Sequence, residues 1–177
     1  MIRSSTRLIS FFLVMSVSIL GMLSGCINSD KTTEYAENIV FTTLDGRTRS
    51  LADFAGKIVV LDLMAVNCQP CWYQMLELKK ISENYSKNSV VIVSIDVWMN
   101  QETVDMINNM LDTFEQYGIV LDWIFGVDDS QGAIRTLYAP QGVPSLYLLD
   151  QKGNIYYSHV GYESYATLAS KIDEKLK

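Results

Sequence analysis

Two largely apolar runs, residues 58–63 and 90–95, constrain the fold of this 177-residue chain more than any other feature. The first run is rich in β-branched residues and is interrupted only by Asp62. A strand with one solvated face would alternate polar and apolar residues, whereas a strand covered on both sides is apolar almost throughout. The sequence therefore predicts a sheet with helices on both faces.

The rest of the chain alternates between strand and helix patterns. Helical spacing of apolar residues, with a period of about 3.6, occurs in four segments, 71–85, 102–117, 130–138 and from 163 onward. Strand patterns occur at 39–41, 121–127, 146–149 and 155–160, and turn signals lie at Asp45-Gly46 and at 150–153. These patterns predict one α/β domain over residues 38–177, with a mixed central sheet flanked by helices.

Residues 1–25 have the pattern of a secretory signal. Arg3 and Arg7 precede residues 8–23, which contain only apolar side chains, glycine and serine. This run ends in Leu-Ser-Gly-Cys at Cys26, which resembles the lipobox of prokaryotic lipoproteins. We therefore predict a signal peptide at 1–25, a lipid anchor on Cys26 and a polar tether over 26–37. An uncleaved signal anchor is the alternative, and both interpretations place the domain outside the cytoplasm, tethered to the cell membrane.

Charge and cysteine content exclude several classes of protein. Without Arg3 and Arg7, 12 basic residues stand against 20 acidic ones, a net charge of −8. No basic tract occurs, so no nucleic-acid-binding surface is expected. The chain has three cysteines, which are too few for a disulfide scaffold or a four-cysteine zinc site, especially if Cys26 is an anchor.

The chemistry of the chain centres on the motif Cys68-Gln69-Pro70-Cys71, which lies between a buried strand and a helix. A C-x-x-C pair in this context is typical of a redox-active dithiol. The unsatisfied N–H groups and the dipole at a helix N-terminus stabilise a thiolate, which is the nucleophilic form. Pro70 suits the first helical turn because its missing N–H has no helical partner there.

A pair of cysteines can also bind zinc, attach a haem or form a structural disulfide. A zinc site needs about four ligands, and the chain otherwise offers His159 and Cys26, so we expect no metal. A c-type haem attachment requires a histidine at position 72, which is Trp72. A purely structural disulfide remains open, since an extracytoplasmic compartment permits one.

Residues 61–71 resemble the strand and active-site loop of thioredoxins, and residues 141–145, Gln-Gly-Val-Pro-Ser, resemble their cis-proline loop. The long segment between these motifs, together with residues 41–46 and 50–57, is similar to the TlpA/ResA-like branch of membrane-anchored, extracytoplasmic proteins. This resemblance implies a thioredoxin fold with an N-terminal β-hairpin extension and an insertion between the C-x-x-C helix and the cis-proline loop. The acid that ResA-like proteins carry three residues after the second cysteine is Gln74 here.

The resemblance also implies a role for each site residue. Cys68 would attack a substrate disulfide and Cys71 would resolve the mixed disulfide, with the Cys68–Cys71 disulfide in place of any cofactor. Asp62 would relay a proton to or from Cys71, the alternative being a strand acid that points to solvent. Pro144, unless it is a plain turn proline, would be cis and expose the Val143 backbone for pairing with a substrate strand. The substrate-binding residues expected beside these two are Gln69, Pro70 and Trp72.

The leading hypothesis is thus a membrane-tethered thiol-disulfide oxidoreductase that reduces protein disulfides. Gln69 and Pro70 are not basic, so the motif lacks the histidine that stabilises the thiolate in strong oxidants, which favours reduction. The expected partners are proteins with disulfides, such as apocytochrome c, and an unidentified electron donor. A thiol peroxidase is an alternative, although Ala65 stands where peroxiredoxins usually have threonine. A Cu(I) metallochaperone is another, since soft thiolates select that ion.

Overall fold

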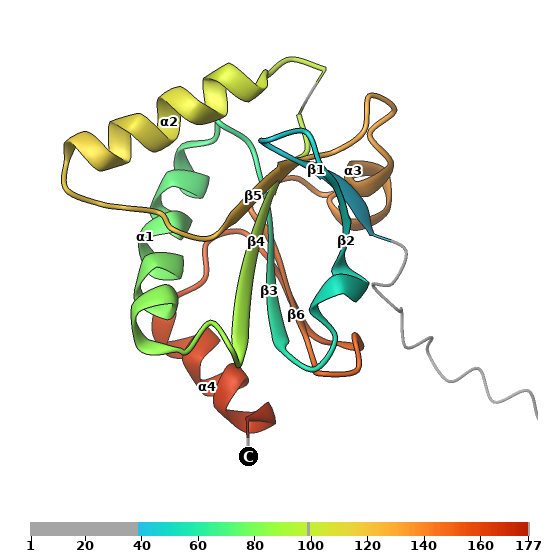
Figure 1. The fold of residues 1–177 in the computed structure, drawn as a ribbon, viewed down its shortest axis with the longest axis vertical. Coiled ribbons are helices and arrows are strands. Elements are labelled where there is room, and N and C mark those ends of the chain that lie inside the picture. The colour runs from blue at the N-terminus through green and yellow to red at the C-terminus, as the bar shows by residue number, and fades with distance from the viewer. Residues whose placement is uncertain (1–38, 99, 177) are drawn as a thin grey trace, which may run out of the picture. The chain divides into compact units, whose positions relative to one another are not determined.

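The computed structural model describes residues 39–98 and 100–176 (Figure 1). The predicted signal peptide at 1–25 and the tether at 26–37, with Cys26, lie outside the described residues. Within the described residues, no helix has the length and apolar content needed to cross a membrane.

A seven-stranded mixed sheet forms the centre of the domain, with strand order β2-β1-β5-β4-β3-β6-β7. The strands β3, β4 and β5 are parallel, and the other neighbouring pairs are antiparallel. The strands are β1 (Val40–Thr43), β2 (Thr48–Ser50), β3 (Ile58–Met64), β4 (Val90–Asp96), β5 (Ile124–Val127), β6 (Ser145–Leu149) and β7 (Ile155–Val160). The mixed sheet predicted from the sequence is therefore confirmed.

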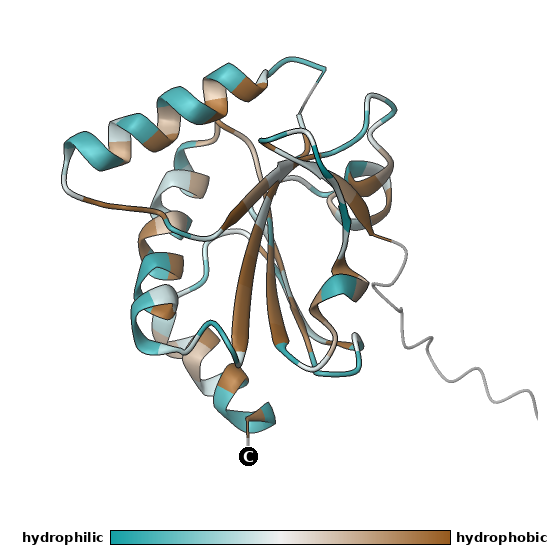
Figure 2. Cartoon of the chain, viewed as in Figure 1, coloured by the Kyte–Doolittle hydropathy of each residue, from teal (hydrophilic) through white to brown (hydrophobic). Residues whose placement is uncertain are grey.

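Helices cover both faces of this sheet, as the two apolar runs predict. They are α1 (Gln69–Asn84), α2 (Val104–Gln116), α3 (Ala133–Tyr138), α4 (Tyr165–Lys175) and the 3-10 helix η2 (Leu51–Phe54). The helices α1 and α4 pack on one face, and α3 and η2 on the other (Figure 1). Because both faces of the sheet are covered, its central strands are apolar, and Figure 2 shows β3 and β4 hydrophobic along most of their length.

The face of β3 that each side chain occupies decides where the polar residue Asp62 points. Ile58 and Val60 pack with residues of α1 and α4, and Met64 packs with Cys71. Alternate residues of a strand share a face, so Asp62 lies on the α1 side of the sheet between Val60 and Met64.

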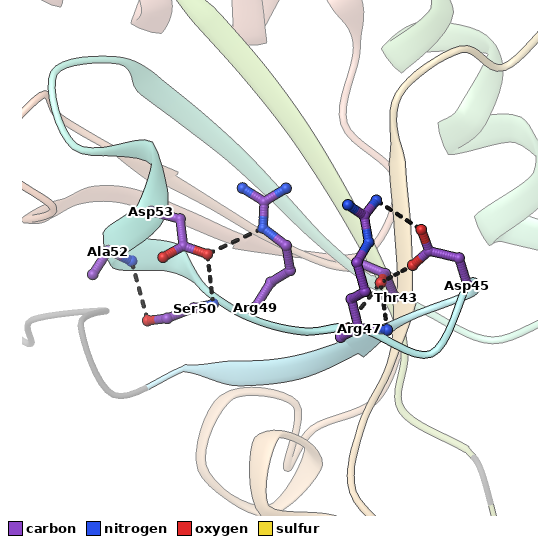
Figure 3. Close-up of polar contacts among 7 residues, drawn as sticks. All are labelled: Thr43, Asp45, Arg47, Arg49, Ser50, Ala52 and Asp53. Carbon is purple, nitrogen blue, oxygen red and sulfur yellow. Dashed lines mark hydrogen bonds and ion pairs between the residues drawn. The ribbon is translucent and has the colours of Figure 1, made fainter.

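The predicted N-terminal hairpin is formed by β1 and β2 and is closed by polar contacts at both ends (Figure 3). At the turn, the Thr43 hydroxyl donates to Asp45, which also forms an ion pair with Arg47 at 2.7 Å. At the other end, Ser50 caps η2, and the Asp53 carboxylate accepts from the Ser50 N–H and from Arg49. The sequence signal for this hairpin was the turn at Asp45.

Four elements begin two or three residues later than the sequence predicts; two of them are α3, which begins at Ala133, and α4, which begins at Tyr165. The strand expected over 121–127 is β5, and it begins at Ile124, because its pairing with β4 starts there, opposite Val93. The helix expected from Glu102 is α2, and it begins at Val104, because the Thr103 side chain caps it by accepting from a backbone N–H. Glu102 is therefore outside the helix, and its side chain is buried.

Candidate active site

Cys68 and Cys71 are joined by a disulfide at the N-terminus of α1, with an Sγ–Sγ distance of 2.15 Å. Cys68 is the N-cap residue, and its Sγ accepts the Cys71 N–H at 3.2 Å. Of the two cysteines, Cys68 is the one that faces solvent, with 8% of its surface exposed, whereas Cys71 is completely buried. Pro70 lies in the first helical turn as expected, where no backbone donor is lost from the helix. An incoming thiol or disulfide can therefore reach Cys68 before Cys71.

The second signature predicted from the sequence lies beside this disulfide. The peptide bond between Val143 and Pro144 is cis. The Val143 carbonyl oxygen lies 3.7 Å from Cys68 Sγ, and the Pro144 carbonyl accepts the Gly161 N–H at 2.8 Å. Pro144 is buried while Val143 is half-buried. The structure thus brings together two motifs that are more than 70 residues apart in the chain.

Asp62 is completely buried, so it does not point to solvent. Its Oδ2 accepts a hydrogen bond from the Ser94 hydroxyl at 2.9 Å, and its Oδ1 is buried with no partner among the described residues. Burial raises the pKa of Asp62 to about 7, and the hydrogen bond from Ser94 offsets part of that rise. A carboxyl group with this pKa can exchange a proton near neutral pH, on the side of the sheet covered by the helix that carries Cys71.

Sequence reasoning missed the residues that support Asp62. Ser94 lies directly across from Asp62 in the pairing of β3 with β4, and the Trp123 indole N–H donates to the Ser94 hydroxyl at 3.0 Å. This chain of donors, Trp123 to Ser94 to Asp62, fixes the orientation of the carboxyl group. The available signal was a serine inside an otherwise apolar strand.

The three residues predicted to contact substrate beside the cysteines have different surroundings. Gln69 and Pro70 are exposed next to Cys68. Trp72 is half-buried, its ring centroid lies 5.1 Å from that of Phe114, and its indole N–H donates to the Val66 carbonyl at 2.7 Å. Trp72 therefore joins α1 to α2 and to the loop before Cys68.

Gln74, at the position where ResA-like proteins carry an acid, is buried one helical turn after Cys71. Its side-chain carbonyl accepts the Glu163 N–H at 2.7 Å and so ties α1 to the start of α4. As for metal ligands, the described residues contain no cluster of three or more His, Cys, Asp or Glu side chains. The Cys68 and Cys71 thiolates, when reduced, are the two soft ligands that this site could offer.

Comparison with known proteins gives one family and one fold. A family model described as the AhpC/TSA family matches residues 32–158. The thioredoxin-like protein YneN of Bacillus subtilis (strain 168) is 26% identical over 140 residues, which are 79% of this chain and 78% of YneN. The thiol-disulfide oxidoreductase ResA of Bacillus thuringiensis (strain Al Hakam) is 28% identical over 164 residues, or 86% of this chain and 90% of ResA.

Solved structures give the same result for the fold. A thiol-disulfide isomerase from Corynebacterium glutamicum superposes with a TM-score of 0.69 at 20% identity, covering 83% of this chain and 98% of the isomerase. StoA from Bacillus subtilis superposes with a TM-score of 0.60 at 18% identity, covering 75% and 93% of the two chains. The thioredoxin fold expected from the sequence is confirmed.

Proposed function

The chain belongs to the AhpC/TSA family and is a thiol-disulfide oxidoreductase, and from this premise we propose that it reduces disulfides of partner proteins through Cys68 and Cys71. The observation that carries the proposal is the position of the disulfide, at a helix N-terminus with the accessible sulfur beside Val143. A helix N-terminus stabilises a thiolate, so the reduced form of Cys68 is activated for attack.

The reaction would proceed in two exchanges. The Cys68 thiolate attacks one sulfur of the substrate disulfide, forming a mixed disulfide and releasing the other substrate sulfur as a thiolate that takes up a proton. The Cys71 thiol then loses its proton and attacks Cys68 Sγ, which releases the second substrate thiol and closes the Cys68–Cys71 disulfide. Two electrons pass from the enzyme dithiol to the substrate, and a separate electron donor must reduce the enzyme again.

Asp62 is the group we assign to the proton of Cys71. Cys71 is buried and needs a base before it can attack, and Asp62 is a buried carboxyl on the same side of the sheet. With its pKa near 7, Asp62 holds a proton readily and gives it up readily at neutral pH. The substrate chain would lie along the exposed backbone at Val143, where an extended segment can pair with it, and beside Gln69 and Pro70.

The direction and the place of the reaction are part of the proposal. Gln69 and Pro70 give the motif no basic group to stabilise the thiolate further, which favours a reductant over a strong oxidant. The apolar segment at 8–23 and Cys26 support export and attachment to the cell membrane as a lipoprotein. Partners of this kind are exported proteins with disulfides, apocytochrome c among them, and a membrane-bound electron donor.

The test uses three cysteine variants of the full chain in detergent, with insulin as the disulfide substrate. We expect Cys68→Ser to abolish reduction, and Cys71→Ser to accumulate a mixed disulfide with insulin, because the resolving thiol is missing. Cys26→Ser is the matched control and should reduce insulin as fast as the chain without substitutions. Full activity of Cys68→Ser would end the proposal.

Two further assays separate this proposal from the other chemistries open to a pair of thiols. A thiol peroxidase would consume hydrogen peroxide at the expense of its dithiol at a rate that depends on Cys68. A Cu(I) carrier would retain copper when purified without oxygen under reducing conditions. We expect neither behaviour.

A further inference from the structure

Two buried carboxyl groups that the proposed mechanism does not use lie beneath the loop that leads to Cys68. Asp96 ends β4, directly opposite Met64 at the end of β3, and is completely buried. Glu102 lies two residues before α2 and is 2% exposed. Charged side chains are seldom buried this deeply unless they have a partner, so Asp96 and Glu102 should each have a hydrogen-bond partner.

Glu102 holds the loop between β3 and Cys68 by its backbone. Its Oε2 accepts the Val66 N–H at 2.6 Å, and its Oε1 accepts the Asn67 N–H at 2.7 Å. On the other side of the same peptide unit, the Val66 carbonyl accepts from Trp72 of α1 at 2.7 Å. The residues that precede Cys68 are therefore fixed from two directions, and two of the three contacts come from one carboxylate.

Asp96 has one satisfied oxygen and one that lacks a donor. Its Oδ1 accepts the Trp98 N–H at 2.7 Å, whereas its Oδ2 is buried with no hydrogen-bond donor among the described residues. Burial and, secondly, the contact with the Glu102 carboxyl raise the pKa of Asp96 to about 7. Two carboxyl groups in contact in a dry site cannot both carry a charge. Both Glu102 oxygens already accept a loop N–H, so the proton belongs on Asp96.

We propose that Glu102 is a positioning residue for Cys68, and that Asp96 is a neutral carboxylic acid whose O–H donates to the Glu102 carboxylate and holds it in place. The hydrogen bonds from Val66 and Asn67 to Glu102 are observed directly. The effect of these bonds on the thiol-disulfide equilibrium rests on the proposed function of the Cys68–Cys71 pair.

Two effects of Glu102 both favour the Cys68–Cys71 disulfide over the dithiol. A fixed loop keeps the Cys68 sulfur close to Cys71, which favours the disulfide, and a loosened loop lowers the effective concentration of one thiol at the other. The Glu102 carboxylate accepts the N–H of Asn67, the residue just before Cys68. A negative charge there disfavours the Cys68 thiolate, so its removal would favour the reduced form. Loss of Glu102 should therefore shift the equilibrium toward the dithiol.

The experiment titrates the full chain in detergent against glutathione at pH 7 and counts free Cys68 and Cys71 by alkylation and mass spectrometry. Glu102→Gln keeps one acceptor but places an amide N–H₂ against the second loop N–H. We expect it to shift the equilibrium toward the dithiol by about tenfold, or about 30 mV. The matched control is Glu77→Gln, because Glu77 accepts the Tyr165 N–H at the start of α4, away from the loop before Cys68. It should change the equilibrium by less than about twofold.

Asp96→Asn is the variant that distinguishes the proposed proton from a structural contact. Its amide N–H₂ supplies the same donor to Glu102 without a charge, so it should titrate within about threefold of the unmodified chain. A tenfold shift in Asp96→Asn would show that Asp96 is charged and would overturn its assignment as the donor. If Glu102→Gln does not fold, Glu102→Asp replaces it, since the shorter side chain cannot reach both N–H groups.

Hydrogen exchange of the peptide that contains Val66 and Asn67 tests the hydrogen bonds to Glu102 separately from the redox chemistry. We expect faster exchange of these two N–H groups in Glu102→Gln and unchanged exchange in Glu77→Gln. Unchanged exchange and an unchanged titration in Glu102→Gln would refute the role of Glu102. If the unmodified chain does not titrate at all, the proposed function fails, and the exchange rates still decide whether Glu102 holds the loop.

Discussion

Replacement of Asp62 by asparagine should stabilise the folded domain at neutral pH and leave its stability unchanged in acid. The buried carboxyl keeps its proton up to about pH 7, whereas the same group in the unfolded chain loses its proton above its ordinary pKa of 3.8. Between these two pKa values the folded state binds more protons than the unfolded state, so the stability of the unmodified protein falls as the pH rises. Asparagine has no proton to lose, and its carbonyl can still accept from the Ser94 hydroxyl.

The size of the effect follows from the two pKa values. A rise from 3.8 to about 7 is about 3 pKa units, which at about 1.4 kcal/mol per unit is a difference of about 4 kcal/mol. The free energy of unfolding of Asp62→Asn should therefore equal that of the unmodified protein below about pH 4 and exceed it by about 4 kcal/mol above about pH 7. The gap opens progressively between these limits.

The assay is urea unfolding of a chain that begins at residue 34, followed by tryptophan fluorescence, with the Cys68–Cys71 disulfide intact and at several pH values from 3.5 to about 8. The same variant should reduce insulin more slowly, because the proposed proton acceptor for Cys71 is missing. A difference in unfolding free energy that does not change with pH would refute the assignment of Asp62 as a buried acid protonated at pH 6.

Three other substitutions test separate parts of the account. Gly126→Ala should lower the free energy of unfolding by about 1–3 kcal/mol in urea unfolding, because its Cβ would lie 2.4 Å from a ring carbon of Phe41; a neutral result would contradict the close packing of β1 on β5. Trp72→Phe should cost about 1 kcal/mol, since the hydrogen bond to the Val66 carbonyl is lost while the aromatic packing is kept, and equal urea midpoints would argue against that bond. Cys26→Ser should abolish lipid modification and signal cleavage, as measured by mass spectrometry of the membrane fraction, and unchanged processing would exclude the lipoprotein.

The sequence predicted those parts of the fold and the site that depend on local patterns. Continuous apolar runs identified β3 and β4, and the turn at Asp45-Gly46 identified the hairpin. The two redox motifs were found because each is short and contiguous, and the structure brings Cys68 and Val143 together. In such segments the residues that decide the structure are neighbours in the chain.

Contacts between distant segments could not be predicted in the same way. Ser94 supports Asp62 only because β3 and β4 pair in one register, and Trp123 reaches Ser94 only because β5 begins at Ile124. A shift of one residue in either pairing would turn these side chains to the other face of the sheet. No periodicity in a single segment fixes that register.

The burial of Glu102 was hidden for a related reason. The sequence predicts a helix that begins at Glu102, and nothing in that pattern indicates a buried carboxyl. The capping hydroxyl of Thr103 moves the start of α2 past Glu102, and the side chain turns toward the loop at Val66. Which carboxyl group receives the N–H donors of a loop depends on the three-dimensional path of two connections, so it became visible only in the structure.

The reduction potential of the Cys68–Cys71 pair tests the central claim most directly. The pair should titrate as a reversible two-electron couple near the value of about −270 mV found for thioredoxin, as expected for a reductant of protein disulfides. A value near the −120 mV or so of strong oxidants would reverse the proposed direction. A pair that did not titrate would be a structural disulfide, and the account of this site as a redox centre would be wrong.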